Sequence, residues 1–253
     1  MAISKNQIKF IRQLEQKKYR RREGLFVAEG TKVVGDLLTH YQPHAIFATA
    51  EWLSNNLSST FTSSSFYEVT DDELGRVSFL QHPQQVLALF PIPENQSFNS
   101  TTAVSSLTLA LDGIQDPGNL GTIIRIADWF GIEHIICSED TVDAWNPKVV
   151  QATMGSIARV NILYNNLSGF LDTLPTNFPI YGTLLDGDNI YTQPLTPHGL
   201  IVMGNEGNGI SPEIRRRVNR RLLIPSYRQD DTAESLNVAI ATAITCAEFR
   251  RRK

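Results

Sequence analysis

The sequence is poor in the residues that mark several common classes of protein. It has two cysteines, Cys137 and Cys246, among 253 residues, which is too few for a disulfide framework and lacks the spacing of metal ligands. No apolar run approaches the roughly 18 to 20 residues needed to cross a bilayer, and residues 1–16 lack the apolar core of a secretory signal. We therefore expect a protein of the reducing cytoplasm, with no membrane association and no metal.

Signatures of two large enzyme groups are also missing. No Gly-x-Ser-x-Gly elbow is present, and the five histidines are scattered without partners at an obvious spacing, so a catalytic serine or cysteine is not supported. The glycine-rich run 203–209 does not fit the dinucleotide-binding fingerprint. Hydrophobic residues make up 42% and charged residues 19% of the chain, which is typical of an ordinary soluble globular protein.

Positive charge is concentrated in short stretches, although the net charge is −3. One basic stretch covers residues 5–22, and two further stretches lie at residues 215–221 and 250–253. Local basic patches on a weakly acidic protein favour binding to one polyanion site, although each run is also compatible with a solvated helix face. The candidate residues for contact with a nucleic acid are Lys5, Lys9, Arg12, Lys17, Lys18, Arg20, Arg21 and Arg22.

The chain divides at residues 91–106, a stretch rich in Pro, Ser, Asn and Thr that is typical of a linker. We predict a small N-terminal α/β domain over residues 1–92, a linker over 93–106 and a second domain over 107–253. In the first domain, apolar patterns indicate a helix around residues 8–14, strands at 25–28, 45–48 and 85–90, and helices at 32–38 and 69–74.

The second domain alternates strands and helices. Residues 107–111 form a continuous apolar run that is typical of a buried parallel strand. Alternation of this kind predicts a parallel sheet covered on both faces, with ligands at the carboxyl ends of its strands. The predicted elements are a helix at 120–130, strands at 134–137, 159–163, 180–184, 200–203 and 221–224, and a final helix at 235–251.

Residues 112–121 join the strand 107–111 to the start of a helix. Such a junction offers unpaired backbone N–H groups and the positive end of the helix dipole. Asn119 can donate and accept hydrogen bonds, and Arg125 lies one turn above Gly121, so its guanidinium can reach the loop. Alternatively, this is only a tight turn, and Arg125 pairs with Asp128.

Two further loops carry polar residues. The run 203–209 has three glycines directly after a predicted strand, and Glu206 would lie at the strand's carboxyl end, where it could hold a hydroxyl or amino group. A plain turn is the alternative. At the start of the final helix, Ser235 suits an N-cap and Asn237 projects from the first turn.

Together the three loops resemble the signature motifs of the SpoU (TrmH) family of the SPOUT superfamily of RNA methyltransferases. The matching stretches are LDGIQDPGNLGTIIRIADWFGI, KVVQATMGSIARV, IVMGNEGNGIS and LLIPSYRQDDTAESLNVAIA, and FVAEGTKVVGDLL is similar to the family's appended RNA-binding domain. The resemblance implies a C-terminal parallel-sheet domain with a trefoil knot, a homodimer and S-adenosylmethionine as cofactor.

The family's residue roles transfer position by position. The resemblance places cofactor contacts on Gly204, Ile224 and Leu236, and we expect Leu184, at the end of a predicted strand, to join them. The polar stretch 227–232 is longer than the family's usual one. Catalytic and RNA-contact roles fall on Asn119, Arg125, Glu206, Ser235 and Asn237.

These observations favour S-adenosylmethionine-dependent 2′-O-ribose methylation of structured RNA. Ribosomal RNA is the expected substrate, and transfer RNA is the alternative. A non-catalytic RNA-binding or ribosome-assembly protein on the same fold is a second reading, against which the intact polar set argues. A small-molecule nucleotide-binding enzyme is a third, against which the basic N-terminal segment argues.

Overall fold

The computed structural model describes residues 3–56, 65–93, 105–228 and 234–251. The chain forms two compact units: the N-terminal unit comprises Met1–Glu94 with Asp143–Arg159, and the C-terminal unit comprises Asn95–Val142 with Val160–Lys253. Residues 94–104 of the predicted linker, and residues 229–233 of the long polar stretch, lie outside the described residues. The domain boundaries drawn from the sequence stay predictions.

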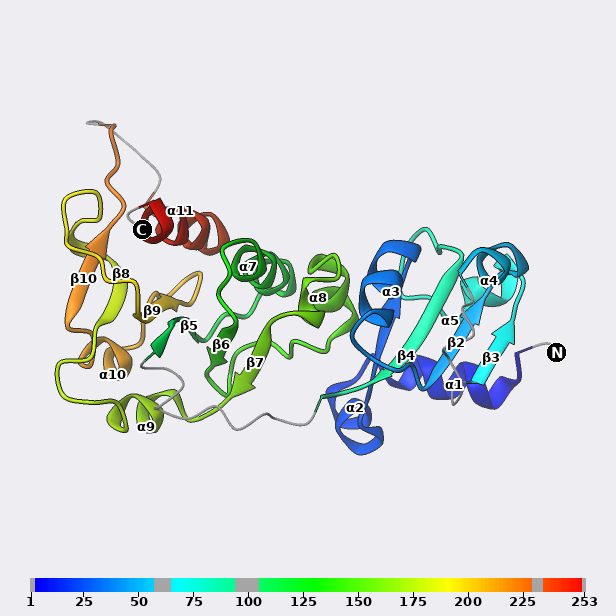
Figure 1. The fold of residues 1–253 in the computed structure, drawn as a ribbon. Coiled ribbons are helices and arrows are strands. Elements are labelled where there is room, and N and C mark those ends of the chain that lie inside the picture. Colours follow the sequence, from blue (N-terminus) through cyan, green and yellow to red (C-terminus); the bar gives the residue numbers. More distant parts are fainter. Residues whose placement is uncertain (1–2, 57–64, 94–104, 229–233, 252–253) are drawn as a thin grey trace. The chain divides into compact units, whose positions relative to one another are not determined.

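The N-terminal unit is built on a mixed sheet of four strands (Figure 1). β4 lies between β1 and β2 and is antiparallel to both, whereas β3 pairs with β2 in parallel. Every residue of β1 and β2 is buried, so these strands appear in the sequence as short apolar runs without alternation. In spatial order the strands are β1 (Leu25–Glu29), β4 (Val86–Pro91), β2 (Ala45–Ala48) and β3 (Ser65–Glu68).

Helices pack on this sheet. Capping boxes begin two of them: Ser4 and Gln7 exchange hydrogen bonds at the start of α1, and Thr70 and Glu73 do the same at α5. The helices are α1 (Lys5–Gln13), α2 (Lys17–Glu23), α3 (Thr31–Leu38), α4 (Ala50–Asn56), α5 (Asp71–Val77), α8 (Pro147–Ala152) and a 3-10 turn at Ser156–Ala158.

The C-terminal unit contains a sheet of six strands, all parallel, which confirms the predicted α/β class. Its two central strands are buried along their whole length. In spatial order the strands are β10 (Arg220–Leu223), β8 (Ile180–Asn189), β9 (Gly199–Gly204), β5 (Leu107–Asp112), β6 (His134–Cys137) and β7 (Asn161–Tyr164).

Two pairs of helices cover the two faces of this sheet (Figure 1). α9 (Leu167–Asp172) and α10 (Pro212–Arg215) pack on one face. α7 (Pro117–Trp129) and α11 (Val238–Arg251) contact each other on the other face, where the Tyr181 and Phe249 rings meet edge to face. None of the helices that the structure describes is long and apolar enough to cross a membrane. The trefoil knot stays a prediction.

Most predicted elements are present, with shifted ends. The helix predicted at 120–130 begins at Pro117, because Asp116 caps it by accepting a hydrogen bond from the Asn119 backbone. The final helix begins at Val238, so the N-cap assignment of Ser235 is wrong. Helices α2 and α4 and strand β3 were not predicted, because their apolar residues show no clear period.

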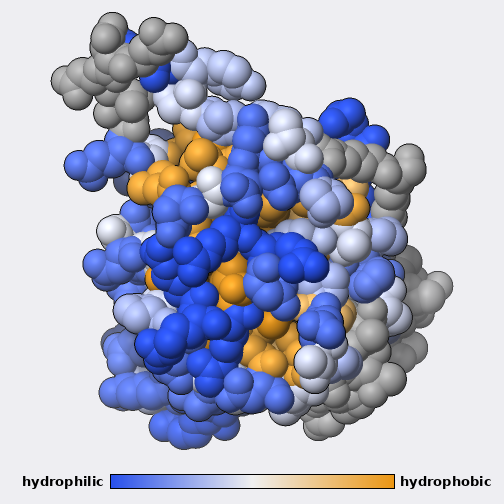
Figure 2. All heavy atoms as spheres, turned by 90° about the vertical axis from the view of Figure 1, so that its left-hand side faces the viewer, coloured by the Kyte–Doolittle hydropathy of each residue, from blue (hydrophilic) through white to orange (hydrophobic). Residues whose placement is uncertain are grey.

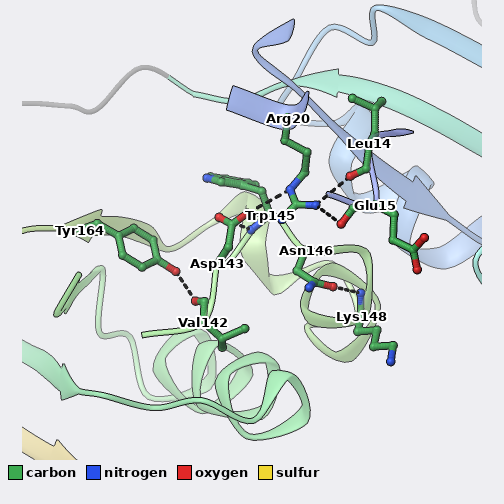
Figure 3. Close-up of polar contacts among 9 residues, drawn as sticks. All are labelled: Leu14, Glu15, Arg20, Val142, Asp143, Trp145, Asn146, Lys148 and Tyr164. Atoms are coloured by element: carbon green, nitrogen blue, oxygen red, sulfur yellow. Dashed lines mark hydrogen bonds and ion pairs between the residues drawn. The ribbon is translucent and has the colours of Figure 1, made fainter. Parts of the chain in front are cut away.

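A buried ion pair holds Asp143–Arg159 within the N-terminal unit (Figure 3). Arg20 has 2% of its side chain exposed and donates to the Asp143 carboxylate and to the carbonyls of Leu14 (2.8 Å) and Glu15 (2.6 Å). Nearby, the Phe26 and Trp145 ring centroids lie 4.7 Å apart. Arg20 was predicted to contact RNA; its guanidinium is instead enclosed by the protein.

Replacing Arg20 should destabilise the protein, because Arg20→Met leaves Asp143 and two carbonyls without their donor. We expect the free energy of unfolding to fall by about 3 kcal/mol, the lower end for breaking a buried pair, since Asp143 keeps 12% of its side-chain exposure. Urea unfolding of the full chain measures this loss. Arg21→Met, at an exposed neighbouring position, is the matched control, and an equal loss in both variants would contradict the assignment.

Candidate active site

Two of the three predicted loops lie side by side at the carboxyl edge of the parallel sheet. β5 and β9 are neighbours, and their register sets Asp112 opposite Gly204 at their ends. The loops that follow β5 and β9 therefore begin side by side at this edge. The Asp112 carboxylate joins the two loops further by accepting a hydrogen bond of 2.6 Å from the Ser211 backbone.

Glu206 connects the second loop to the first. Its carboxylate accepts hydrogen bonds from the backbone N–H groups of Gln115 and Asp116, each at 3.2 Å, and from the Asn119 side-chain amide at 3.0 Å. These donors lie at the start of α7, where unpaired N–H groups and the helix dipole favour a negative charge. Glu206 thus neutralises a helix start that the sequence indicated as an anion site.

Asn237 adds the third loop to this network. Its side-chain amide donates to the Asn119 side-chain oxygen at 2.9 Å. Its own oxygen accepts from the backbone of Ala239 (2.9 Å) and Ile240 (3.3 Å), so Asn237 caps α11. A continuous chain of hydrogen bonds therefore runs from Glu206 through Asn119 to Asn237, so residues of all three loops lie together.

Asn205, in the middle of this region, was not singled out from the sequence. The Asn205 side chain donates to the Gly113 carbonyl at 2.6 Å and accepts from the backbone of Gly207 and Asn208, each at 3.0 Å. Gly204 is also required by the packing, because a Cβ there would lie 2.2 Å from the Gly209 carbonyl carbon. An asparagine that bonds to the backbone two and three residues ahead is a common turn device, and that signal was available in the run GNEGNG.

The other predicted catalytic residues lie outside the network. Arg125 is on the exposed side of α7, and it makes no hydrogen bond or ion pair with another residue that the structure describes. The alternative interpretation, in which Arg125 pairs with Asp128, therefore finds no support among the described residues. Ser235 is exposed two residues before Asn237.

Three of the four predicted cofactor residues lie on strands of the parallel sheet or directly after one, and Leu236 lies just before α11. The register of Gly182 with Val202 sets Leu184 level with Gly204, and Ile224 follows β10 directly. The exposed fractions are 50% for Leu236, 72% for Leu185 and 85% for Tyr227. Apolar atoms interrupt a mainly hydrophilic surface on the side that carries β8 and β10 (Figure 2). The described residues contain no cluster of His, Cys, Asp and Glu that could hold a metal ion.

The basic residues of the N-terminal unit differ in their surroundings. Lys17 is half-buried, and Arg12 donates to the Ser78 carbonyl at 2.6 Å and stacks over the Phe79 ring. The cations of Lys18 and Arg22 both lie over the Tyr19 ring. The exposed members of the set are Lys5, Lys9, Arg12, Lys18, Arg21 and Arg22.

The basic stretch 215–221 is largely neutralised by acidic partners. Arg215 and Arg221 both pair with Asp186, and Arg217 makes a two-pronged pair with Asp172. The alternative interpretation of this stretch, a solvated surface, therefore fits the structure better than a polyanion site does.

Electrostatics keep Glu206 ionised. Burial by itself would raise the pKa of the carboxyl, but the hydrogen bonds from Asn119 and from the backbone outweigh it and lower the pKa below its ordinary value of 4.5. A carboxylate that accepts several N–H donors is a fixed negative group at neutral pH, and it can orient a neighbouring amide or hydroxyl.

Comparison with known proteins adds the family context. Residues 106–247 match the SpoU rRNA Methylase family, and residues 5–88 match an MRM3-like substrate binding domain. A relative from Bacillus subtilis (strain 168), named 23S rRNA (guanosine(2553)-2'-O)-methyltransferase RlmP, is 31% identical over 251 residues, which are 98% of this chain and 97% of the relative.

Solved structures are similar to this chain over its full length. A TrmH-family protein from Porphyromonas gingivalis is 42% identical, with a TM-score of 0.88 and 99% of both chains covered. An AdoMet-bound rRNA methyltransferase from Sinorhizobium meliloti is 30% identical, with a TM-score of 0.85, covering 100% of this chain and 98% of that one.

The lowered pKa of Glu206 should depend on Asn119. In Asn119→Leu, loss of the amide donor should move the pKa of Glu206 upward, toward 4.5. Because a lowered folded-state pKa stabilises the protein above the ordinary pKa, that stabilisation is lost as the pH falls through the lowered value. In the variant this stabilisation should be smaller, and its loss should be complete at a higher pH.

Carboxyl ¹³C NMR over a pH titration measures this shift. Asn208→Leu is the matched control, because Asn208 is exposed in the same loop and its side chain does not contact Glu206. If Glu206 titrated at the same pH in wild-type protein and Asn119→Leu, the network would not be responsible for the shift.

Proposed function

Because the chain belongs to the SpoU rRNA methylase family, we propose that it transfers the methyl group of S-adenosylmethionine to a ribose 2′-hydroxyl of ribosomal RNA. The observation that carries the proposal is the hydrogen-bonded chain Glu206–Asn119–Asn237 at the carboxyl edge of the parallel sheet. The names of the relatives support the substrate, since the Bacillus subtilis relative is a 23S rRNA 2'-O-methyltransferase. Transfer RNA is the alternative substrate.

The residues beside this network suit the proposed cofactor. Leu184, Ile224 and the half-exposed Leu236 offer apolar side chains for an adenine ring and a methionine chain. Gly204 ends β9 at the carboxyl edge of the parallel sheet, where the ligands of such sheets bind. When bound, S-adenosylmethionine supplies an already activated methyl group on its sulfonium. The protein then has to position the hydroxyl in line and help to remove its proton.

Arg125 is the proposed RNA clamp of the site. It is exposed on α7, the helix that also carries Asn119, and the described residues leave its guanidinium without an internal partner. A guanidinium matches a phosphate through two parallel hydrogen bonds. We assign Arg125 to the phosphate next to the reacting ribose, where its positive charge would hold the RNA backbone.

The remaining polar residues would orient the ribose. Glu206 holds the Asn119 amide, and Asn119 in turn holds Asn237, so a hydroxyl that meets this set finds donors and acceptors in fixed positions. Ser235, exposed two residues earlier, is assigned an RNA contact. This arrangement supplies orientation, which is the largest contribution that the protein can make when the methyl group is already activated.

The N-terminal unit is the proposed docking surface for the RNA. Its helices α1 and α2 expose five cations, of which Arg22 also pairs with the neighbouring Glu23. Phosphate contacts of this kind position an RNA without reading its sequence. These residues are Lys5, Lys9, Lys18, Arg21 and Arg22. The free, buried thiols of Cys137 and Cys246 support a reducing compartment, and we propose the cytoplasm.

A reconstituted reaction tests the function. Purified protein, labelled S-adenosylmethionine and unmodified ribosomal or transfer RNA should yield label on a ribose 2′-oxygen, located by mass spectrometry of RNase digests. Arg125→Ala should lower the rate by about 10² to 10³-fold, as expected for loss of one preorganised charged contact, while calorimetry shows unchanged affinity for S-adenosylmethionine. Arg76→Ala, an exposed arginine of α5, is the control.

Three results would contradict parts of this proposal. Label found only in transfer RNA would show that the substrate is transfer RNA and not ribosomal RNA. Cofactor binding without any transfer would favour the non-catalytic alternative. Full activity of Arg125→Ala would remove Arg125 from the site.

We also propose that the protein is a homodimer. One side of α11 is buried through Thr242, Cys246 and Phe249, yet the other side is apolar as well, with Ile240 52% exposed and Ile244 half-buried. A helix that is apolar on both sides is normally covered on both. A second copy of the chain would cover this exposed side.

Glutamate on the exposed side of α11 should separate the copies. Ile240→Glu would place a charge in an apolar interface, so the dissociation constant of the dimer should rise by at least about tenfold. Sedimentation equilibrium measures the change. Ala50→Glu, which adds the same charge at an exposed position of α4, should leave the mass unchanged. A wild-type protein that sediments as a monomer would disprove the proposal.

A further inference from the structure

The N-terminal unit contains a cavity that the proposed reaction does not use. Its volume is about 220 Å³, and residues from three parts of the chain line it. Val27, Phe79 and Leu80 provide apolar walls, the buried Glu29 contributes to the lining, and Lys148 and Gln151 come from α8. This is smaller than the roughly 300 to 1,000 Å³ of typical drug-sized sites, so it suits one small flat group.

Glu29 is a buried acid with few donors. Only 5% of it is exposed. Its two oxygens accept hydrogen bonds from the Ser78 hydroxyl and the Phe79 backbone (2.8 Å). Burial nevertheless raises the pKa of Glu29, despite these bonds and the nearby charge of Arg12. Each carboxylate oxygen has a further lone pair, so an occupant with N–H groups would supply donors that the protein does not.

The cavity wall that α8 provides is fixed in place. Asn146 caps this short helix through the Lys148 backbone N–H (2.9 Å), and Arg20 holds the preceding Asp143 (Figure 3). Trp145 packs on Phe26 of β1, the strand that also contributes Val27 and Glu29. The cavity is therefore a preformed feature of the unit.

The basic helix α1 reaches the same cavity. Arg12 donates to the Ser78 carbonyl at 2.6 Å, and its guanidinium lies 4.7 Å from the centroid of the Phe79 ring. Arg12 thus connects the exposed cations of α1 to the aromatic wall of the cavity. RNA bases that leave a helix are commonly held in this way, by an aromatic side chain and by hydrogen bonds to the base edge.

We propose that this cavity binds an unpaired guanine base of the RNA substrate. The Watson–Crick edge of guanine carries two adjacent N–H donors, which match the two oxygens of Glu29. Its O6 and N7 are acceptors, which match the Lys148 ammonium and the Gln151 amide. The inference rests on the proposed function for its RNA, but not on the transfer reaction.

The same arrangement disfavours the other bases. Adenine and cytosine place a ring-nitrogen acceptor beside their amino group, so one oxygen of Glu29 would meet a lone pair. Uracil has a single N–H donor between two acceptors. Buried groups left without partners are the main source of such discrimination. Inosine, which lacks the guanine amino group, should bind with intermediate affinity.

Nucleotide binding to the full chain tests the chemistry of the cavity. Equilibrium dialysis with labelled 5′-GMP, 5′-IMP and 5′-AMP would be run with S-adenosylhomocysteine present, so that the proposed cofactor site is filled. We expect GMP to bind at least about tenfold more tightly than AMP. Glu29→Gln should abolish this preference, because the amide presents an N–H group to guanine. Glu15→Gln, an exposed acid of the same unit, should retain it.

Two variants at the rim of the cavity keep the proposal testable if Glu29→Gln fails to fold. Lys148→Met and Gln151→Leu alter side chains outside the buried core and should each weaken GMP binding severalfold, without changing urea unfolding. Equal affinities of the wild-type protein for GMP and AMP, or unchanged GMP binding in all three cavity variants, would overturn the proposal.

Crosslinking then identifies the source of the base. Ribosomal RNA containing 6-thioguanosine should crosslink under ultraviolet light to peptides that carry Phe79 or Lys148. GMP binding without this crosslink would mean a free nucleotide site and would overturn the RNA assignment. Because neither measurement needs methyl transfer, a protein that binds GMP but does not methylate RNA would separate this proposal from the proposed function.

Discussion

The candidate site depends on one constraint, which is the parallel pairing of β5 with β9. Because Asp112 lies opposite Gly204 at the ends of these strands, the chain leaves both at the same edge of the sheet. Two loops about 90 residues apart in sequence must then share a small space, and Glu206 satisfies the N–H groups at the start of α7. A change of register by one residue would turn the strand-end side chains to opposite faces, and the network could not form.

The second organising interaction is the ion pair between Arg20 and Asp143. The connection between β6 and β7 leaves the parallel sheet, and its residues Asp143–Arg159 pack in the N-terminal unit. Burying two charges is costly unless each is fully bonded, and Arg20 meets this condition through two carbonyls in addition to Asp143. The interaction therefore specifies one position for α8, and α8 forms a wall of the guanine-sized cavity.

Sequence patterns predicted those features that depend on neighbours in the chain. The buried strands 107–111 and 134–137 were predicted because a parallel sheet covered on both faces needs continuous apolar runs. The polar set Asn119, Glu206 and Asn237 followed from loops at strand ends. Arg20 was misassigned because its partner, Asp143, is 123 residues away and no local pattern reveals it. The cap of α11 was misplaced by two residues because serine and asparagine are equally good caps, and only the fold chooses between them.

Arg20 and Arg125 show why burial, not residue type, separates the two roles of arginine here. A guanidinium that is 2% exposed must have its donors bonded inside the protein, since an unpaired buried cation costs several kcal/mol, and such a group has no donors left for a ligand. Arg125, exposed on α7, is hydrated at little cost and keeps its five donors available to a phosphate. Among the residues that the structure describes, the amides of Asn119 and Asn237 are neutral and the Glu206 carboxylate is already held by backbone N–H groups, so none of the three pairs with that cation. The site therefore combines a hydrogen-bonded polar framework with an exposed cation, and α7 carries a member of each, Asn119 and Arg125.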